Sequence, residues 1–141
     1  MKLPPPTGLT FADATSEDEV LKGILVELSK RGFLVWRSNT GALFESFPAG
    51  MLNGRQAFYR GRLVRFGCEG TPDVLGFCRL CGLLLAVEAK APKRGVVSDV
   101  QRAFAAQVAP SGALYGVART VAQAVELADA HRSRCHRSSA R

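Results

Sequence analysis

The chain has 141 residues, which is enough for one domain with a single core and too few for two. A hydrophobic fraction of 47% and a charged fraction of 22% exclude a disordered or fibrous chain. Its formal net charge of +7 makes a polyanion the first partner to consider, because each phosphate contact releases condensed counterions.

The sequence contains no strong targeting signal. No run approaches the roughly 20 apolar residues that span a bilayer, and the prolines of MKLPPPTGLT interrupt what a signal peptide needs as an apolar stretch. Four cysteines in a chain with its own core do not make a disulfide framework, which fits a reducing compartment. We therefore expect a cytoplasmic protein that does not bind a membrane.

The N-terminal third predicts an arm, a helix and a strand. Residues 1–15 carry three consecutive prolines and no periodicity, so we expect an extended arm. Ser16 and Glu19 form a capping-box pattern, and apolar residues then recur at helical spacing until Gly32. The segment FLVWR (33–37) is rich in strand formers.

The middle of the chain is less regular. Within residues 42–67, the segment QAFYRGRLVRFG suggests a hairpin that turns near Arg60-Gly61. Its arginines stand beside aromatic residues with no acid between them: Arg55, Arg60, Arg62 and Arg65 beside Phe58, Tyr59 and Phe66.

The C-terminal half alternates strands and helices. Residues 73–77 and 83–90 predict an antiparallel pair joined by CRLCG, and Ser98 with Gln101 begins a helix that ends near Ala109. A strand over 113–118 and a helix over 121–132 follow, before an arginine-rich tail that looks frayed. We expect an α/β domain over residues 16–130, with a mixed sheet flanked by helices in the order α-β-β-β-α-β-α, and a basic tail over 131–141.

Three charged residues lie in the otherwise apolar strand pair. Alternation puts Glu88 and Lys90 on one face, and Asp73 on the preceding strand can lie opposite them. An ionised carboxylate in a dry core costs several kcal/mol unless it is paired. Mg²⁺ removes that cost, because Asp73, Glu88 and the main-chain carbonyl of Ala89 supply oxygen ligands. Lys90 would orient or help deprotonate a water, or offset charge on a phosphate.

Two further polar residues are candidates for this site. The apolar stripe of the first helix is centred near Glu17, so we expect Glu17 to face the sheet. Gln101 is explained by capping but lies on the helix side that can reach the site. Plain structural readings stay open: Asp73 in a turn, Glu88 and Lys90 as an ion pair on a solvated face, and Glu17 as a helix-dipole partner.

The ordered set of blocks around these residues resembles the VRR-NUC family of the PD-(D/E)xK nuclease superfamily. After Glu17, the blocks are RGFLVWRSNTGA (31–42), GRLVRFGCEGTPDVLGF (61–77), AVEAK (86–90) and SDVQ (98–101). The resemblance covers about residues 16–119 and is strongest to short, stand-alone members from phages and bacteria.

The resemblance implies a three-layer, restriction-endonuclease-like core and Mg²⁺- or Mn²⁺-dependent hydrolysis of phosphodiester bonds in DNA. The matching active-site positions are Glu17, Asp73, Glu88, Lys90 and Gln101. Similarity to Holliday-junction resolvases implies a homodimer and branched DNA as substrate. Residues 44–56 make a longer stretch than the family pattern leads us to expect.

Six residues near these blocks, five of them basic, are candidate phosphate contacts, although a solvated surface position explains each of them better. They are Arg37, Asn39, Arg62, Arg65, Lys93 and Arg94.

Two other functions stay open. One is a catalytically inactive DNA-binding module of the same fold. The other is a small zinc protein in which Cys78-x2-Cys81 is joined by His131, Cys135 or His136.

Overall fold

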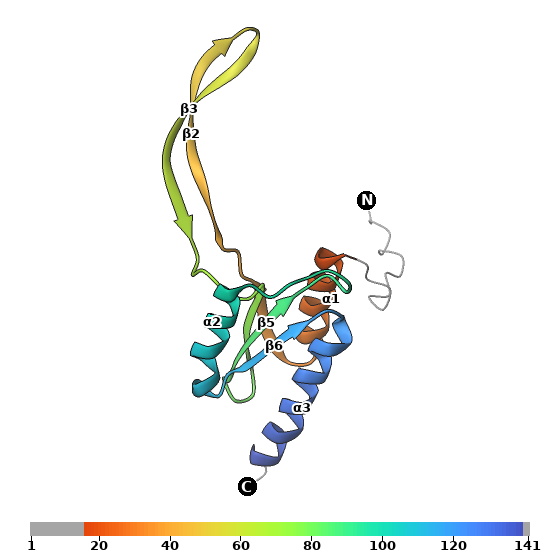
Figure 1. Ribbon diagram of the computed structural model, residues 1–141. Helices are drawn as coiled ribbons and strands as arrows, with labels where there is room; N and C mark the ends of the chain where they lie inside the picture. Colours follow the sequence, from red (N-terminus) through yellow and green to blue (C-terminus); the bar gives the residue numbers. More distant parts are fainter. Residues whose placement is uncertain (1–15, 140–141) are drawn as a thin grey trace, which may run out of the picture.

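The computed structural model describes residues 16–139, so the extended N-terminal segment expected over residues 1–15 lies outside the described part of the chain. The helices and strands follow one another as shown in Figure 1: α1 (Glu17–Lys30), β1 (Phe33–Arg37), β2 (Gly41–Leu52), β3 (Arg55–Phe66), β4 (Val74–Cys78), β5 (Leu84–Ala89), α2 (Asp99–Val108), a 3-10 turn (Ala109–Ser111), β6 (Leu114–Ala118) and α3 (Val121–Ser139).

The body of the molecule is a mixed four-stranded sheet with helices on both faces. The strand order is β1-β4-β5-β6, in which β1 and β5 are antiparallel to β4 and β6 is parallel to β5. Helices α1 and α3 pack on one face, and α2 lies on the other (Figure 1). The expected α/β fold with a mixed sheet is therefore confirmed.

The main core lies between the sheet and the pair α1 and α3. Strand alternation turns Val74, Leu85 and Val87 toward this side, where they meet apolar residues of α1 such as Ile24 and Leu28. All five are fully buried, and each such side chain contributes about 1.5–3 kcal/mol by leaving water. Helix α1 begins as the sequence predicted, since both hydrogen bonds of the capping box are present.

The opposite face is thinly covered. None of the residues of α2, all of which the structure describes, is fully buried. Large apolar side chains on this face of β1, β4 and β5 remain 37–46% exposed: Leu34, Trp36, Phe77 and Leu84.

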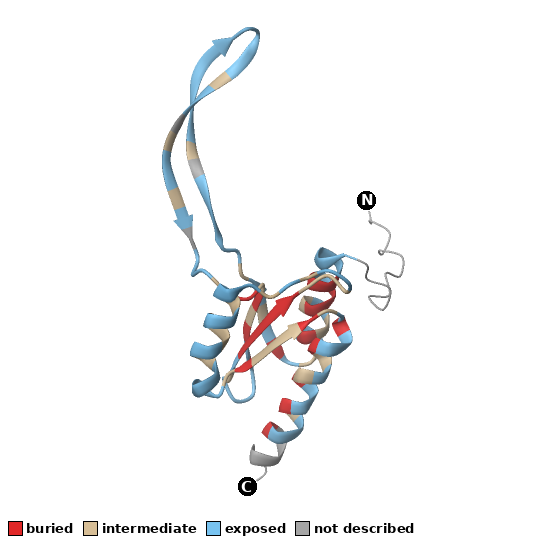
Figure 2. Cartoon of the chain, viewed as in Figure 1, coloured by how far each residue is buried: buried red, intermediate tan, exposed pale blue. Residues whose placement is uncertain are grey.

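Strands β2 and β3 form a long two-stranded hairpin that projects from the body, and we call residues 41–66 the arm (Figure 1). Nearly all of its described side chains are exposed, as Figure 2 shows, including Phe47, Met51 and Tyr59. The turn expected at Arg60-Gly61 is wrong, because the chain reverses at Asn53-Gly54. There φ is 51° at Asn53 and 74° at Gly54, the paired positive values of a type I′ turn, which Asn-Gly favours.

The C-terminal segment is also more ordered than expected. Helix α3 continues to Ser139, so the described part of the tail placed over 131–141 is helical. His131 and Cys135 lie one helical turn apart and are both 7% exposed. Their contacts with the body explain why the helix persists beyond residue 132 in a sequence that is otherwise polar.

No helix in the described part of the chain is long and apolar enough to cross a membrane.

Candidate functional site

The register of β4 and β5 brings the two carboxylates together. Val74 pairs with Val87, so the same register one residue on puts Asp73 opposite Glu88. Directly opposite residues of an antiparallel pair lie on one face with Cβ atoms about 4.5–5.5 Å apart. The main-chain N–H of Ala89 donates to Asp73 Oδ2 at 3.0 Å, which holds this carboxylate at the end of β5.

Glu88 is the centre of the site. It is 1% exposed, and its Oε1 accepts hydrogen bonds from Lys90 Nζ at 2.7 Å and from the Gln101 side-chain amide. Its Oε2 is buried and has no hydrogen-bond partner among the described residues. The reading of Glu88 and Lys90 as an ion pair on a solvated face is therefore wrong.

The surroundings disfavour the charged form of Glu88. Burial raises the pKa of its carboxyl, and the charge of Asp73 raises it further, which together outweigh the hydrogen bond and the attraction from Lys90. A cation between the two carboxylates would relieve this repulsion.

Lys90 is held in its charged form. Burial lowers the pKa of its ammonium and is the largest single effect, but the hydrogen bond to Glu88 and the attraction of Glu88, Glu17 and Asp73 outweigh it. The net result is a pKa above the ordinary value for lysine, so Lys90 stays protonated at neutral pH.

Pro72 explains why the Ala89 carbonyl is available at this site. In a strand, the N–H and C=O of one residue point to the same edge, and the Ala89 N–H points toward Asp73. The register places fully buried Pro72 opposite Ala89, where another residue would donate its N–H to the Ala89 carbonyl. Proline has no N–H, so it leaves this oxygen without that donor.

Gln101 has both roles that the sequence suggested. Its Oε1 accepts from the Ser98 N–H at 2.9 Å, and the Gln101 N–H donates to Ser98 Oγ at 3.3 Å, which completes the capping box of α2. Its Nε2 donates to Glu88 Oε1. The first turn of α2 is thus joined directly to the buried carboxylate.

Glu17 lies at the edge of the site and not inside it. Glu17 is exposed, as are Ser16, Asp18 and Glu19. The expectation that its side chain turns into the sheet is therefore wrong. Its charge nevertheless contributes to the raised pKa of Lys90, which shows that the carboxylate lies within electrostatic range of the buried cluster.

Tyr115 is a residue that the sequence analysis missed. On β6 it pairs with Ala86, two residues before Glu88, and its hydroxyl is buried without a partner in the described structure. Burial raises the pKa of this hydroxyl, and the charge of Glu88 raises it further. The only sequence signal was a hydroxyl in a strand that otherwise reads as core.

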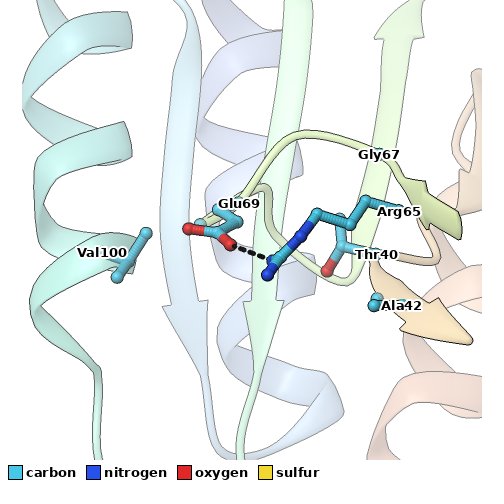
Figure 3. A pocket seen from close by; sticks show the side chains of 8 residues that line it. Thr40, Ala42, Arg65, Gly67, Glu69 and Val100 are labelled. Atoms are coloured by element: carbon cyan, nitrogen blue, oxygen red, sulfur yellow. Dashed lines mark hydrogen bonds and ion pairs between the residues drawn. The ribbon is translucent and has the colours of Figure 1, made fainter. Parts of the chain in front are cut away.

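A hollow of about 500 Å³ lies between the base of the arm and α2 (Figure 3). Its wall includes Arg65, Glu69, Gly70 and Val100. Gly70 lies three residues before Asp73 and Val100 lies next to Gln101, so this hollow adjoins the carboxylate site along the chain.

The six candidate phosphate contacts fall into three groups. Arg37 is exposed at the end of β1 and Asn39 is exposed just after it. Arg37 Nη1 lies 3.7 Å from Asp18 Oδ1. Arg62 and Arg65 are exposed on the arm, where each pairs with an acid at 3.3 Å. The last two, Lys93 and Arg94, are exposed in the loop between β5 and α2.

A second cluster of chemically reactive residues lies at the other end of β4. The structure brings Cys78 and Cys81 to His131 and Cys135, four of the five residues named for the zinc alternative. The side chain of His136 lies outside the described part of the chain. The sequence predicted that His131 and Cys135 lie in a frayed tail. It did not show that both lie on α3, where they face the Cys-x2-Cys pair.

Comparison of the chain with family models, with curated proteins and with solved structures found no match. The functional argument therefore depends on the α/β fold and on the geometry of the two clusters.

Proposed function

We propose that this chain is a Mg²⁺- or Mn²⁺-dependent DNA endonuclease with a restriction-endonuclease-like core of the VRR-NUC type. The observation that carries the proposal is Glu88 Oε2, a buried carboxylate oxygen without a hydrogen-bond partner among the residues that the structure describes, next to Asp73 and Lys90 at the end of an apolar sheet. A purely structural core seldom contains a buried carboxylate oxygen without a hydrogen bond, because no interaction offsets the free energy lost when the oxygen leaves water.

The residues present fit a hard divalent cation. Asp73 and Glu88 supply carboxylate oxygens, Ala89 supplies a carbonyl oxygen, and Glu17 is placed to act from the edge through water. When bound, the cation would polarise a phosphate oxygen and lower the pKa of an attacking water.

The remaining residues orient groups and balance charge. Lys90 stays protonated, so its role is to offset negative charge on the phosphate and not to accept a proton. Gln101 and Lys90 together fix Glu88 Oε1, and Oε2 accepts no hydrogen bond from the described residues, so it can bind a ligand. A carboxylate fixed in this way needs little reorganisation when the ligand binds.

The basic surface supplies the contacts for DNA. The hollow beside α2 is lined by Gly70 and Val100, which are near Asp73 and Gln101 in the chain, and by Arg65 at the base of the arm; Arg62 continues this basic surface along β3. Their ion pairs with Glu45 and Glu69 are exposed, and exposed pairs contribute only about 0–1 kcal/mol, so phosphates can replace the acids.

A homodimer that acts on branched DNA is part of this proposal. The half-exposed apolar residues on the α2 face, such as Trp36 and Phe77, form a surface that a second copy would cover. Two sites held at a fixed spacing would match the two arms of a junction that are cut symmetrically.

The direct test is a cleavage panel of four-way junctions, flaps, nicked duplexes and plain duplexes, with Mg²⁺, with Mn²⁺ and with chelator. We expect cleavage that requires the metal and is fastest on a branched substrate. A mass measurement in solution should give twice the mass of the chain.

The panel also separates the enzyme from an inactive DNA-binding module of the same fold. The module would shift the mobility of these DNAs and cut none of them with either metal. That outcome would contradict the enzymatic proposal and leave the basic surface as the functional feature.

A further inference from the structure

The four ligand atoms of the second cluster are already close to one another. The sulfurs of Cys78, Cys81 and Cys135 and a ring nitrogen of His131 all lie within 4.8 Å of one another. Cys81 Sγ and His131 Nε2 lie 3.2 Å apart. Tetrahedral zinc with bonds of about 2.3 Å to sulfur and about 2.0 Å to nitrogen separates its ligand atoms by about 3.5–3.8 Å. Side-chain movements of about 1 Å or less are therefore enough to bring the four ligand atoms to these separations.

The ligands come in two local pairs whose spacing is typical of zinc sites. Cys78 and Cys81 have the C-x2-C spacing and lie at the turn between β4 and β5, where the Gly82 N–H donates to the Cys78 carbonyl at 2.7 Å. His131 and Cys135 are four residues apart on α3, so they project from one side of the helix. A cysteine pair on a hairpin turn facing a pair on a helix supplies four converging ligands.

The turn also orients one sulfur. The main-chain N–H groups of Cys81 and Leu80 hydrogen bond to the sulfur of Cys78. Hydrogen bonds of this kind orient metal ligands and tune them.

The neighbouring cysteines disfavour ionisation of Cys135. Hydrogen bonding with Cys81, burial and the nearby charges of Cys81 and Cys78 raise the pKa of Cys135 to about 11. No disulfide joins any of the four cysteines, all of which lie in the described part of the chain.

We propose that Cys78, Cys81, His131 and Cys135 form a structural zinc site that fastens the C-terminal half of α3 to the β4–β5 hairpin. Three thiolates and an imidazole suit zinc and not Mg²⁺. Four protein ligands close the coordination sphere, which is the arrangement of structural sites.

This site is separate from the proposed nuclease site and does not depend on it. Asp73 precedes β4 and Cys78 ends it, so the two clusters are about 17 Å apart at the usual rise per strand residue. Zinc would hold together two segments that are distant in sequence, the β4–β5 hairpin and the C-terminal half of α3.

The test begins with the metal content of the wild-type chain, purified with a reducing agent and without chelator. Elemental analysis should find about one zinc per chain, and Co²⁺ in its place should give the intense visible bands of a thiolate-rich tetrahedral site. Removal of zinc by a strong chelator should lower the melting temperature by roughly 10 °C or more.

Matched variants locate the site. Cys135→Ser should retain less than about a tenth of the zinc, whereas Cys68→Ser should retain all of it, because Cys68 is an exposed cysteine outside the cluster. His131→Cys should keep zinc as a four-cysteine site and change the cobalt spectrum.

Four results would overturn the proposal. They are a wild-type chain with neither zinc nor cobalt bands, equal loss of zinc from Cys68→Ser and Cys135→Ser, a mass that shows a disulfide within the cluster under reducing conditions, and iron with sulfide in place of zinc. If Cys135→Ser fails to fold, the cobalt spectra of the wild-type chain and of His131→Cys still decide the question. Loss of nuclease activity is not a readout here, so failure of this site and failure of the proposed function are distinguishable.

Discussion

Among single residues, Glu88 has one carboxylate oxygen held by two side chains and the other without a hydrogen-bond partner in the described part of the chain. Lys90 and Gln101 both donate to Oε1, and Oε2 is buried. A buried ion pair seldom stabilises a fold more than well-packed apolar residues would, because both groups lose their hydration. Its presence here is better explained by chemistry than by stability.

The Glu88–Lys90 pair predicts a non-additive effect on stability. Lys90→Met should lower the free energy of unfolding by about 3 kcal/mol, because it leaves a buried carboxylate without its cation. The double variant Glu88→Gln/Lys90→Met should recover most of this loss, since no buried charge then remains. Urea denaturation of both variants measures the difference.

An exposed pair provides the control for that measurement. Lys30→Met removes the ion pair with Glu27 on the surface of α1 and should change stability by less than about 1 kcal/mol. A double variant that is as unstable as Lys90→Met alone would show that the two charges are not coupled.

Much of the site was predictable at this scale. Strand alternation and a short hairpin determine which residues face one another, which is enough to bring Asp73, Glu88 and Lys90 together. Pro72 and Tyr115 were not predictable, because the role of each depends on which strand lies beside it. The exposure of Glu17 depends on where α1 begins relative to the sheet.

At the scale of elements, a close backbone approach joins α2 to the loop that carries Asp73. Gly70 has φ of 81°, and a Cβ at this position would meet the main-chain carbonyl of Val100. Val100 is adjacent to Gln101, which bonds to Glu88. Gly70 therefore lets the two halves of the site approach each other.

Substitution of this glycine should impair the site more than the fold. Gly70→Ala should lower the rate of DNA cleavage at least about tenfold, because it pushes α2 and Gln101 away from Glu88. Gly112→Ala is the matched control, since Gly112 has φ of 76° but open space around it. It carries only the strain of the positive φ, about 1 kcal/mol, and should cut DNA normally. Equal rates for the two variants would contradict this role.

The elements that sequence analysis misjudged lack a local apolar pattern. The Asn53-Gly54 turn is a strong signal, but the arm has no core of its own against which alternation can be recognised. Helix α3 beyond residue 132 is polar, and only the burial of His131 and Cys135 against distant segments extends it. In α3, contacts between distant segments thus override local propensity.

At the scale of the whole molecule, a compact body carries an exposed arm, and the chain has a net charge of +7. The body alone contains both clusters, one toward each end of β4. The arm adds basic and apolar surface that the described body does not cover (Figure 2). The proposed function thus places the chemistry in the body and part of the DNA contact on the arm.

This division predicts how salt affects binding. If Arg62 and Arg65 contact phosphates, each replacement by Gln should reduce the slope of log binding constant against log salt concentration by about 0.9. The rate of DNA cleavage at saturating DNA should change little. Lys30→Gln, on the exposed surface of α1, should leave the slope unchanged. Fluorescence anisotropy at several salt concentrations measures it, and unchanged slopes for both arginine variants would remove the arm from the interface.

If the carboxylate cluster hydrolyses DNA with a divalent metal, cleavage must depend on Asp73. Cleavage of a labelled four-way junction is measured with wild type, Asp73→Asn and Asp99→Asn, where Asp99 is an exposed acid on α2 paired with Arg102. We expect Mg²⁺ to support cleavage by wild type and Asp99→Asn, whereas Asp73→Asn should bind the junction but cut it at least about a thousandfold more slowly. Full cleavage by Asp73→Asn would show that this cluster is not the active site.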